Sequence, residues 1–448
     1  MTNDLTRGKP LPIIIRFALP LMLAALFQQI YTMTDMYVAG NVIGSRALAV
    51  IGVSNAFIFS MTIVMSGLTA GFTAMASRHF GAGEASLLKQ TVVGSLYIAL
   101  ACAVFFAALG IFGAEPVMRL LNTPDDIYAD TVVFVRICFG GSAGMILSYS
   151  AYALLRAVGD SKTPLIFLIV TSVLNVLLDI LFIWTLNMGV NGAALALVTA
   201  QCVSAAVMLA YMRRRFELFR LSGADFAIPF KIVWDILKIG LPAATQSTLL
   251  AFGDMVVAGV VNTYGSDMAA AYSTGNRIVL LHAMFVSNLS LAHAVYAGQN
   301  LGAKKLDRIR EGFRKTAFLS LALSAIIGLF VYFYGHLWVR LFIAESDAHI
   351  ESIVSLTNEL LHVHGASFLF LGMIFFYNNT LRGMGRMGAP FLSGIGELTA
   401  KVGFSFLFTL LFGYAGLWYV YPMGWILGIL PPLIWFHLGR WKKGVAAA

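Results

Sequence analysis

The sequence predicts an all-α integral membrane protein with twelve transmembrane helices, arranged as two six-helix lobes that are parallel repeats of each other. Hydrophobic residues make up 59% of the chain and charged residues 11%, whereas soluble domains average about 25% charged residues. Apolar runs such as 163–186 and 316–335 supply the roughly 20 residues that a helix needs to cross a hydrocarbon core. Lipid offers no partner for open backbone groups, so each run is expected to be helical.

The two halves of the chain repeat one another. Residues 35–42 read DMYVAGNV and residues 254–261 read DMVVAGVV, while 155–164 read LRAVGDSKTP and 381–390 read LRGMGRMGAP. Two like bundles around a shared site are the expected plan of a transporter that works by alternating access. Because each half has an even number of spans, both enter the membrane from the same side, and the repeats should be parallel.

Each span is expected where an apolar stretch lies between polar connections. The first half supplies the spans 11–38, 47–77, 90–114, 130–154, 165–188 and 190–212, and the second supplies 232–263, 270–298, 316–343, 354–380, 389–412 and 414–439. Between them, the polar segment RRRFELFRLSGADFAIPFK reads as a linker. The predicted organisation is therefore an amino-terminal lobe at 1–212, a cytoplasmic linker at 213–231 and a carboxyl-terminal lobe at 232–448.

Basic and acidic residues fall on opposite sides of the predicted spans. One side carries most of the basic residues, among them Arg7, Lys9, Arg78, Lys89, Lys162, Arg213 to Arg215, Arg220, Lys304 to Lys315 and Arg440. The other side carries Glu115, Asp125, Asp126, Asp130, Glu345, Asp347 and Glu351. The positive-inside rule then places both termini in the cytoplasm. The net charge of +9 thus reflects topology and contact with anionic lipid, so nucleic acid is not an expected partner.

Several other patterns have no catalytic or metal-binding interpretation. The three cysteines, Cys102, Cys138 and Cys202, are single residues in apolar spans and are expected to be buried thiols. His362 and His364 point to different faces of a helix, which is poor geometry for a shared metal. No resident metal or cofactor is therefore expected.

Charged side chains within apolar spans are few, and they mark the expected site, because an ionised group there costs several kcal/mol. Asp35 lies in the first span and Asp179 in the fifth, and Asn175 precedes Asp179 by four residues on the same helix face. If the two carboxyl groups are close, like charge and desolvation both favour the neutral acid. Such a carboxyl group can hold a proton or attract a cation. This exclusivity is what an antiporter needs, and it points to Asp35 as the principal proton carrier. The plainer alternative is that these side chains only bond neighbouring helices.

The ordered motifs are similar to those of the multidrug and toxic compound extrusion (MATE) transporters. They are Leu19-Pro20 followed by DMYVAG, then ASRHFGAGE, LLRAVGDSKTP and GVNGAALALVTAQ, and the resemblance covers essentially the whole chain. It implies two six-helix lobes around a central cleft, and export of cationic drugs in exchange for protons or sodium. Asp35, Asn175 and Asp179 match positions of the DinF-like branch, in which a hydroxyl of the sixth span, here Thr199, often completes the network.

Pro20 interrupts the hydrogen-bond ladder of the first span and can act as a kink or hinge. The resemblance links bending of that helix to protonation of its aspartate. The other interpretation is an ordinary membrane proline that neighbouring groups compensate.

The carboxyl-terminal half offers secondary candidates for coupling. Asp254 repeats Asp35, and Glu397 and Lys401 are four residues apart in one span, so an ion pair within the helix is the first expectation. The sodium-coupled branch would have a carboxylate in the tenth span, where this chain has Tyr377, Asn378 and Asn379. That difference favours protons as the coupling ion.

These observations predict a proton-coupled multidrug exporter of the inner membrane, a monomer whose partners are cationic drugs and the lipid bilayer. The alternatives within transport are a sodium-coupled exporter, a passive channel and a lipid-linked saccharide flippase, which would need cations such as Arg136, Arg277 or Lys401 in the cleft. An intramembrane enzyme is a different class, and no cluster of catalytic side chains at useful spacing supports it.

Overall fold

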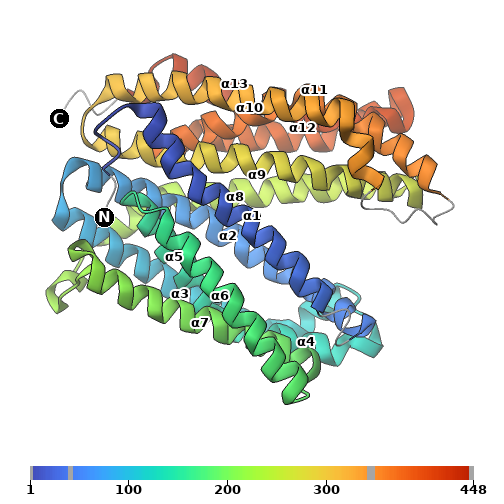
Figure 1. Cartoon of the computed structure of the whole chain (residues 1–448), viewed down its shortest axis with the longest axis horizontal. Coiled ribbons are helices and arrows are strands. Elements are labelled where there is room, and N and C mark those ends of the chain that lie inside the picture. The colour runs from blue at the N-terminus through green and yellow to red at the C-terminus, as the bar shows by residue number, and fades with distance from the viewer. Residues whose placement is uncertain (1–3, 39–43, 341–348, 443–448) are drawn as a thin grey trace. The chain divides into compact units, whose positions relative to one another are not determined.

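The computed structural model describes residues 4–38, 44–340 and 349–442, and it contains only helices and their connections over those ranges (Figure 1). The α-helices of the first half are α1 (Pro10–Val38), α2 (Ser45–Ala82), α3 (Ala85–Leu120), α4 (Asp125–Gly140), α5 (Ser142–Ala157), α6 (Lys162–Asp179) and α7 (Gly189–Arg215). Those of the second are α8 (Phe230–Asn262), α9 (Ser266–Gly302), α10 (Leu306–Arg340), α11 (Ile350–Gly383), α12 (Gly388–Phe412) and α13 (Val420–His437). The short helices are η2 (Ile180–Thr185), which is a π-helix, and the 3-10 helices η3 (Glu217–Phe219), η4 (Gly223–Phe226), η5 (Gly413–Tyr419) and η6 (Arg440–Lys442).

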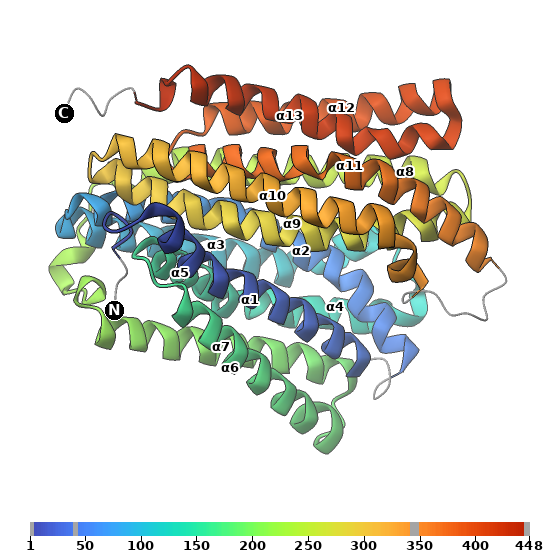
Figure 2. The ribbon, with the colours of Figure 1, turned by 45° about the horizontal axis from the view of Figure 1, so that its top comes forward.

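The described helices account for the twelve predicted spans. Ten helical stretches are long and apolar enough to cross a membrane, and α4 with α5 forms a further span bent by 45°. One of the ten, Gly388–His437, contains α12, η5 and α13. Figure 2 shows α12 and α13 side by side, so this stretch is two spans. The all-α, twelve-helix prediction is confirmed.

The predicted span at 130–154 is one bent unit rather than a straight helix. Its break lies at Gly140 and Gly141. A Cβ on Gly141 would lie 2.0 Å from Cγ1 of Val198, so glycine lets α7 approach the bend closely. Adjacent glycines are a common cause of such kinks, because they hold the helical backbone weakly.

The chain divides into two compact units, and two helices contribute to both. Unit 1 contains residues 1–4 and 23–244, and unit 2 contains residues 5–22 and 245–448. Helices α1 and α8 therefore each pass from one unit to the other, and in both the boundary follows two residues after a proline, Pro20 or Pro242. Packing defines these units, whereas sequence repetition defined the lobes 1–212 and 232–448, which remain a prediction.

Within unit 1, small residues let helix backbones touch. A Cβ on Gly67 would lie 2.2 Å from Cα of Ala244, and one on Gly71 would lie 2.6 Å from the carbonyl oxygen of Ile236. Helix α2 and the first part of α8 thus pack backbone against backbone. Membrane helices depend on such close contact, because lipid supplies no hydrophobic driving force between them.

Unit 2 uses the same device and adds the beginning of α1. A Cβ on Gly328 in α10 would lie 2.4 Å from the carbonyl oxygen of Gly365 in α11. Ile14 and Phe17 of α1 belong to one buried cluster with Tyr296 of α9. The Leu5 amide also donates to Oε1 of Gln299 over 2.9 Å.

The predicted linker is folded against unit 1. Phe216 and Phe219 are buried in a cluster with residues of α2, α3, α5 and α7. The hydroxyl of Tyr97 on α3 donates to the carbonyl of Phe226 over 2.8 Å. Asp225 accepts from the amide of Ser222 at 2.7 Å and from its hydroxyl at 2.9 Å, and lies 3.5 Å from Nζ of Lys89. Apolar packing and polar contacts therefore both hold the linker against unit 1.

Asp225→Asn should loosen this segment. The Ser222 amide, the Ser222 hydroxyl and the Lys89 ammonium together hold the pKa of Asp225 below its ordinary value of 3.8. A lowered pKa in the folded state stabilises the docked linker at neutral pH, and this contribution is lost as the pH falls through that pKa. We expect faster deuterium exchange over 222–227 in the variant at pH 7, measured by mass spectrometry. Asp235→Asn, which removes only an exposed pair with Lys238, is the control. Equal exchange in both variants and the unaltered chain would contradict this account.

Candidate functional site

A polar contact between α1 and α6 lies where the sequence predicts the coupling site. The hydroxyl of Tyr31 donates a hydrogen bond to Oδ1 of Asn175. Asn175 is only 2% exposed, and Tyr31 is half-buried. A buried amide in an apolar helix is costly without a partner, so this bond fixes one face of α6 toward α1 within unit 1.

The two predicted carboxyl residues follow this contact by one helical turn on each helix. Asp35 comes four residues after Tyr31, and Asp179 comes four residues after Asn175, where it is 5% exposed. These helices are the first and fifth spans, so they run in the same direction and their next turns lie on the same side of the contact (Figure 1). The backbone of Asp35 is helical, but its side chain lies outside the described residues.

The structure adds a feature at Asp179 that the sequence pattern did not signal. Asp179 is the last residue of α6 and is followed at once by the π-helix η2. The wider turn is seen in the bond from the Leu186 amide to the carbonyl of Leu181 at 3.0 Å. Single π-helical turns occur often at functional sites, where they change the direction in which side chains project.

A hydroxyl contact joins α6 to α7, but through a different residue from the one named in the sequence. Thr171 donates to the hydroxyl of Ser204. Thr199, the predicted fourth member of the network, is half-buried on α7 and remains a prediction. Sequence reasoning missed Tyr31 and Ser204. The sequence marked each of them only as a polar residue about one helical turn from another polar residue.

Pro20 lies inside α1 and is buried. It cannot donate to the carbonyl of Arg16, so the helix loses one ladder bond just before it passes from unit 2 to unit 1. This position suits a hinge, because a weakened turn lies between segments that pack in different units. The hinge role itself remains a prediction.

The secondary candidates of the carboxyl-terminal half form a network within unit 2. Nζ of Lys401 on α12 lies 2.6 Å from Oδ1 of Asp254 on α8 and 5.0 Å from the ring centre of Tyr421. The Tyr421 hydroxyl donates to the same carboxylate oxygen over 3.0 Å and lies 2.7 Å from the hydroxyl of Tyr272. A carboxylate, an ammonium group and two phenols thereby connect α8, α9, α12 and α13.

The expected pair between Glu397 and Lys401 within one helix is wrong. Lys401 pairs with Asp254 across helices instead, because α8 brings a carboxylate to its ammonium group. Glu397 is 7% exposed and lies one turn earlier on α12. Nearby, Nη2 of Arg382 donates to Oε1 of Gln246 over 2.7 Å.

Two glycines make room for this network. A Cβ on Gly253 would lie 2.9 Å from Cδ of Lys401, and a Cβ on Gly428 would lie 2.6 Å from Cγ of Glu397. Because any larger residue would push these side chains away, glycine allows α8 and α13 to pack directly over the charged groups on α12.

The three polar residues of α11 that replace a carboxylate have structural partners. The Tyr377 hydroxyl lies 2.8 Å from Nε2 of His437, Nδ2 of Asn378 donates to Ser393 over 2.9 Å, and Asn379 accepts from Arg382 at 3.4 Å. Within the described part of the chain, no three His, Cys, Asp or Glu residues gather as metal ligands would.

Comparison with known proteins identifies relatives along nearly the whole chain. A probable multidrug resistance protein YpnP of Bacillus subtilis is 26% identical over 98% of this chain and 97% of its own. A probable multidrug resistance protein NorM of Thermotoga maritima is 25% identical, covering 96% and 93%. A solved structure described as MATE in the bent conformation has a TM-score of 0.90 at 20% identity, covering 99% and 98%, which shows the same fold.

The family model described as MatE matches this chain twice, over residues 20–181 and 242–407. The two matches begin at Pro20 and Pro242, the paired prolines of α1 and α8, which fits the internal repetition of the sequence. The matched residues make up most of the chain. The chain therefore belongs to the MatE family of membrane transporters.

Proposed function

We propose that this protein exports amphipathic cations, including drugs, across the cytoplasmic membrane in exchange for protons. The observation that carries the proposal is the buried polar face of α6, where Asn175 bonds to Tyr31 of α1 and Asp179 follows one turn on. The relatives described above as multidrug resistance proteins support the type of substrate.

The exchange would rest on one carboxyl group serving two ligands. In a site of low polarity, an ionised Asp35 attracts a cation, and a protonated Asp35 does not. Entry of a proton from outside would therefore release the substrate, and loss of that proton toward the cytoplasm would restore the attraction. The charge of Asp179 would shift the balance between proton binding and cation binding at Asp35.

The bond between Tyr31 and Asn175 would convert protonation into helix movement. It lies one turn from Asp35, so a change of charge there alters the energy of the same turn of α1. Pro20 lies eleven residues before Tyr31. It would absorb the resulting bend, since its helical turn lacks one backbone hydrogen bond. In this scheme Thr199 is a further ligand of the same site.

The cytoplasmic location of both termini rests on the distribution of charge. On the acidic side of the spans, three arginines form ion pairs, namely Arg46–Asp130 at 3.0 Å, Arg136–Glu115 at 2.7 Å and Arg340–Glu351 at 2.9 Å. Arg213 and Arg214 on the other side form no ion pair with any described residue. The positive-inside rule counts arginine and lysine rather than net charge, so it favours the cytoplasm for the side that carries most of the basic residues.

Two of the three cations that a lipid-linked saccharide flippase would need are already engaged. Lys401 pairs with Asp254 and Arg136 pairs with Glu115. These pairs leave less positive charge for a pyrophosphate group, so drug export is the better supported function.

Asp35→Asn should abolish proton-driven transport, because asparagine cannot release a proton or carry a charge. We expect ethidium efflux from proteoliposomes under a proton gradient to fall at least about a hundredfold, the lower end of the effect of removing a proton-transfer group. Asp125→Asn, at the exposed first turn of α4, is the matched control and should retain normal efflux. Normal efflux by Asp35→Asn would remove this residue from the mechanism.

The coupling ion can be tested in the same vesicles. A proton gradient alone should drive ethidium or norfloxacin efflux, and a sodium gradient alone should not, since α11 presents Tyr377, Asn378 and Asn379 without a carboxylate. Efflux driven by sodium alone would replace the proton with Na⁺ and leave the export function intact.

Tyr31→Phe should slow transport more than it weakens substrate binding. The variant keeps the ring but loses the bond to Asn175, which connects α1 to α6. We expect the maximal rate to fall several-fold with little change in KM, measured by initial rates of drug uptake into inverted vesicles. Tyr264→Phe, in the connection between α8 and α9, is the control. A normal rate would show that the contact is not used in the cycle.

We propose that the network of Asp254 and Lys401 supports the fold rather than carrying the coupling proton. Lys401 is 4% exposed, so Asp254→Asn leaves its ammonium group buried without its partner. The carboxylate side chain itself is 51% exposed, so we expect a loss of about 1 to 3 kcal/mol and a lower Tm in detergent. The double variant Asp254→Asn/Lys401→Gln should recover part of this loss.

Asp307→Asn is the control, because its side chain is 96% exposed and pairs only with Arg310 on the same helix. It should change the Tm little. Proton-driven transport per folded molecule should persist in Asp254→Asn. Loss of transport with an unchanged Tm would instead place coupling in the carboxyl-terminal half.

A further inference from the structure

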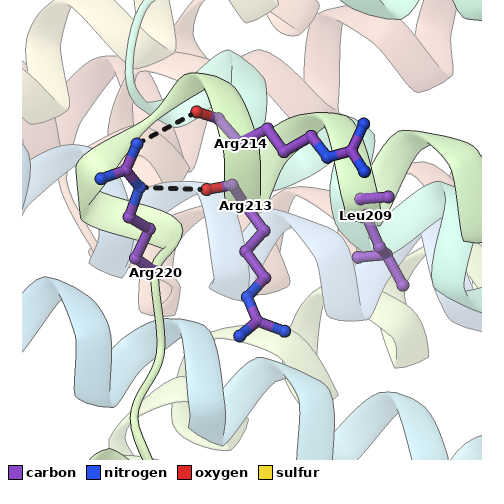
Figure 3. Close-up of a pocket in the computed structure, with 5 residues that line it drawn as sticks. Leu209, Arg213, Arg214 and Arg220 are labelled. Carbon is purple, nitrogen blue, oxygen red and sulfur yellow. Dashed lines mark hydrogen bonds between the residues drawn. The ribbon is translucent and has the colours of Figure 1, made fainter.

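The end of α7 forms a groove lined by arginines. Arg213, Arg214 and Arg220 line it together with Leu209 and Ala210, and its volume is about 640 Å³. Figure 3 shows the guanidinium group of Arg220 facing the last turn of α7. Its Nε donates to the carbonyl of Arg213 over 3.4 Å and its Nη2 to the carbonyl of Arg214 over 3.3 Å. Arg220 therefore caps the helix and brings a third positive charge to the groove.

None of the described acidic side chains lines this groove. Among the described residues, Arg213, Arg214 and Arg220 take part in no ion pair, whereas each of the three pairs on the acidic side joins an arginine to a carboxylate. All three arginines line the same groove, so an anion held there would interact favourably with each of them. The groove thus has three positive charges, and no described carboxylate balances them.

An apolar track leads from the membrane to the groove along one face of α7. Val203 is 44% exposed and Val207 is 53% exposed, and Ala210 and Arg214 are exposed on the same face at helical spacing. This helix is apolar enough to span a membrane, so the exposed valines face lipid and the arginines lie near the polar surface. An amphiphile with an anionic head and apolar chains matches both parts of the face.

We propose that this groove binds the headgroup of an anionic phospholipid, with the acyl chains lying along Val203, Val207 and Ala210. Guanidinium groups bind phosphate oxygens in pairs of parallel hydrogen bonds, which gives arginine an advantage over lysine at such sites. Basic clusters beside a membrane helix attract anionic lipid by about 1 kcal/mol per side chain.

The site gives the lipid a structural role. The groove joins the end of α7 to the linker residue Arg220, and the linker continues to α8, the helix that passes between the two units. A headgroup bound by Arg220 and by the arginines of α7 connects the linker to the helix, so it stabilises the docked linker.

The test uses the whole chain in nanodiscs of phosphatidylcholine, with phosphatidylglycerol added in steps and the Tm measured at each step. We expect Arg213→Gln/Arg214→Gln to need roughly thirtyfold more phosphatidylglycerol for the same rise in Tm. The matched control is Lys9→Gln/Lys162→Gln, which removes two exposed bases elsewhere and should behave like the unaltered chain. An equal loss in the control would reduce the effect to general surface charge and overturn the proposal.

Two further arms separate a shaped site from charge alone. Arg213→Lys/Arg214→Lys keeps the charge and should still weaken the response, because lysine cannot form paired bonds; a normal response would overturn the groove. Glycerol phosphate in solution should give no rise in Tm, and a rise equal to that from lipid would overturn the lipid assignment. All variants should have similar Tm values in pure phosphatidylcholine, which shows that they are correctly folded. If the glutamine variant has a lower Tm there, the comparison rests on the lysine variant.

Discussion

The free-energy cost of placing polar groups in hydrocarbon is the constraint on which this structure depends. An ionisable or amide side chain inside a membrane span needs a partner, and the protein meets this need differently in its two halves. In unit 1, Asn175 is bonded to the phenol of Tyr31. In unit 2, the carboxylate of Asp254 is paired with an ammonium group.

In the proposed mechanism, this difference separates a carboxyl group that exchanges its proton from one that does not. A carboxylate with a lysine at 2.6 Å has its charge already balanced, so it has little need of a proton or a cationic substrate. In the proposed mechanism, the charge of Asp35 depends instead on whether a proton or a cationic substrate occupies the site. In the proposed mechanism, the two aspartates related by the sequence repetition, Asp35 and Asp254, have different tasks.

The pattern of apolar spans was sufficient to predict the twelve helices, because a membrane span has a fixed length and must satisfy its own backbone. The bend at Gly141 and the π-helix after Asp179 were not predictable in this way, since they depend on how α7 packs against each neighbour. For the site, spacing on one helix placed Asn175 and Asp179 on a common face. Contacts between helices escaped the sequence, which is why Tyr31 and Ser204 were missed and Lys401 was paired with Glu397 rather than Asp254.

Proton release on substrate binding tests the central claim most directly. Purified protein in a weakly buffered detergent solution at neutral pH is mixed with a cationic drug, and a pH indicator reports the protons that leave. This account predicts that drug binding releases protons from the unaltered chain and none from Asp35→Asn. Binding without release, or equal release from both proteins, would contradict the exchange of a proton for a cation at this carboxyl group.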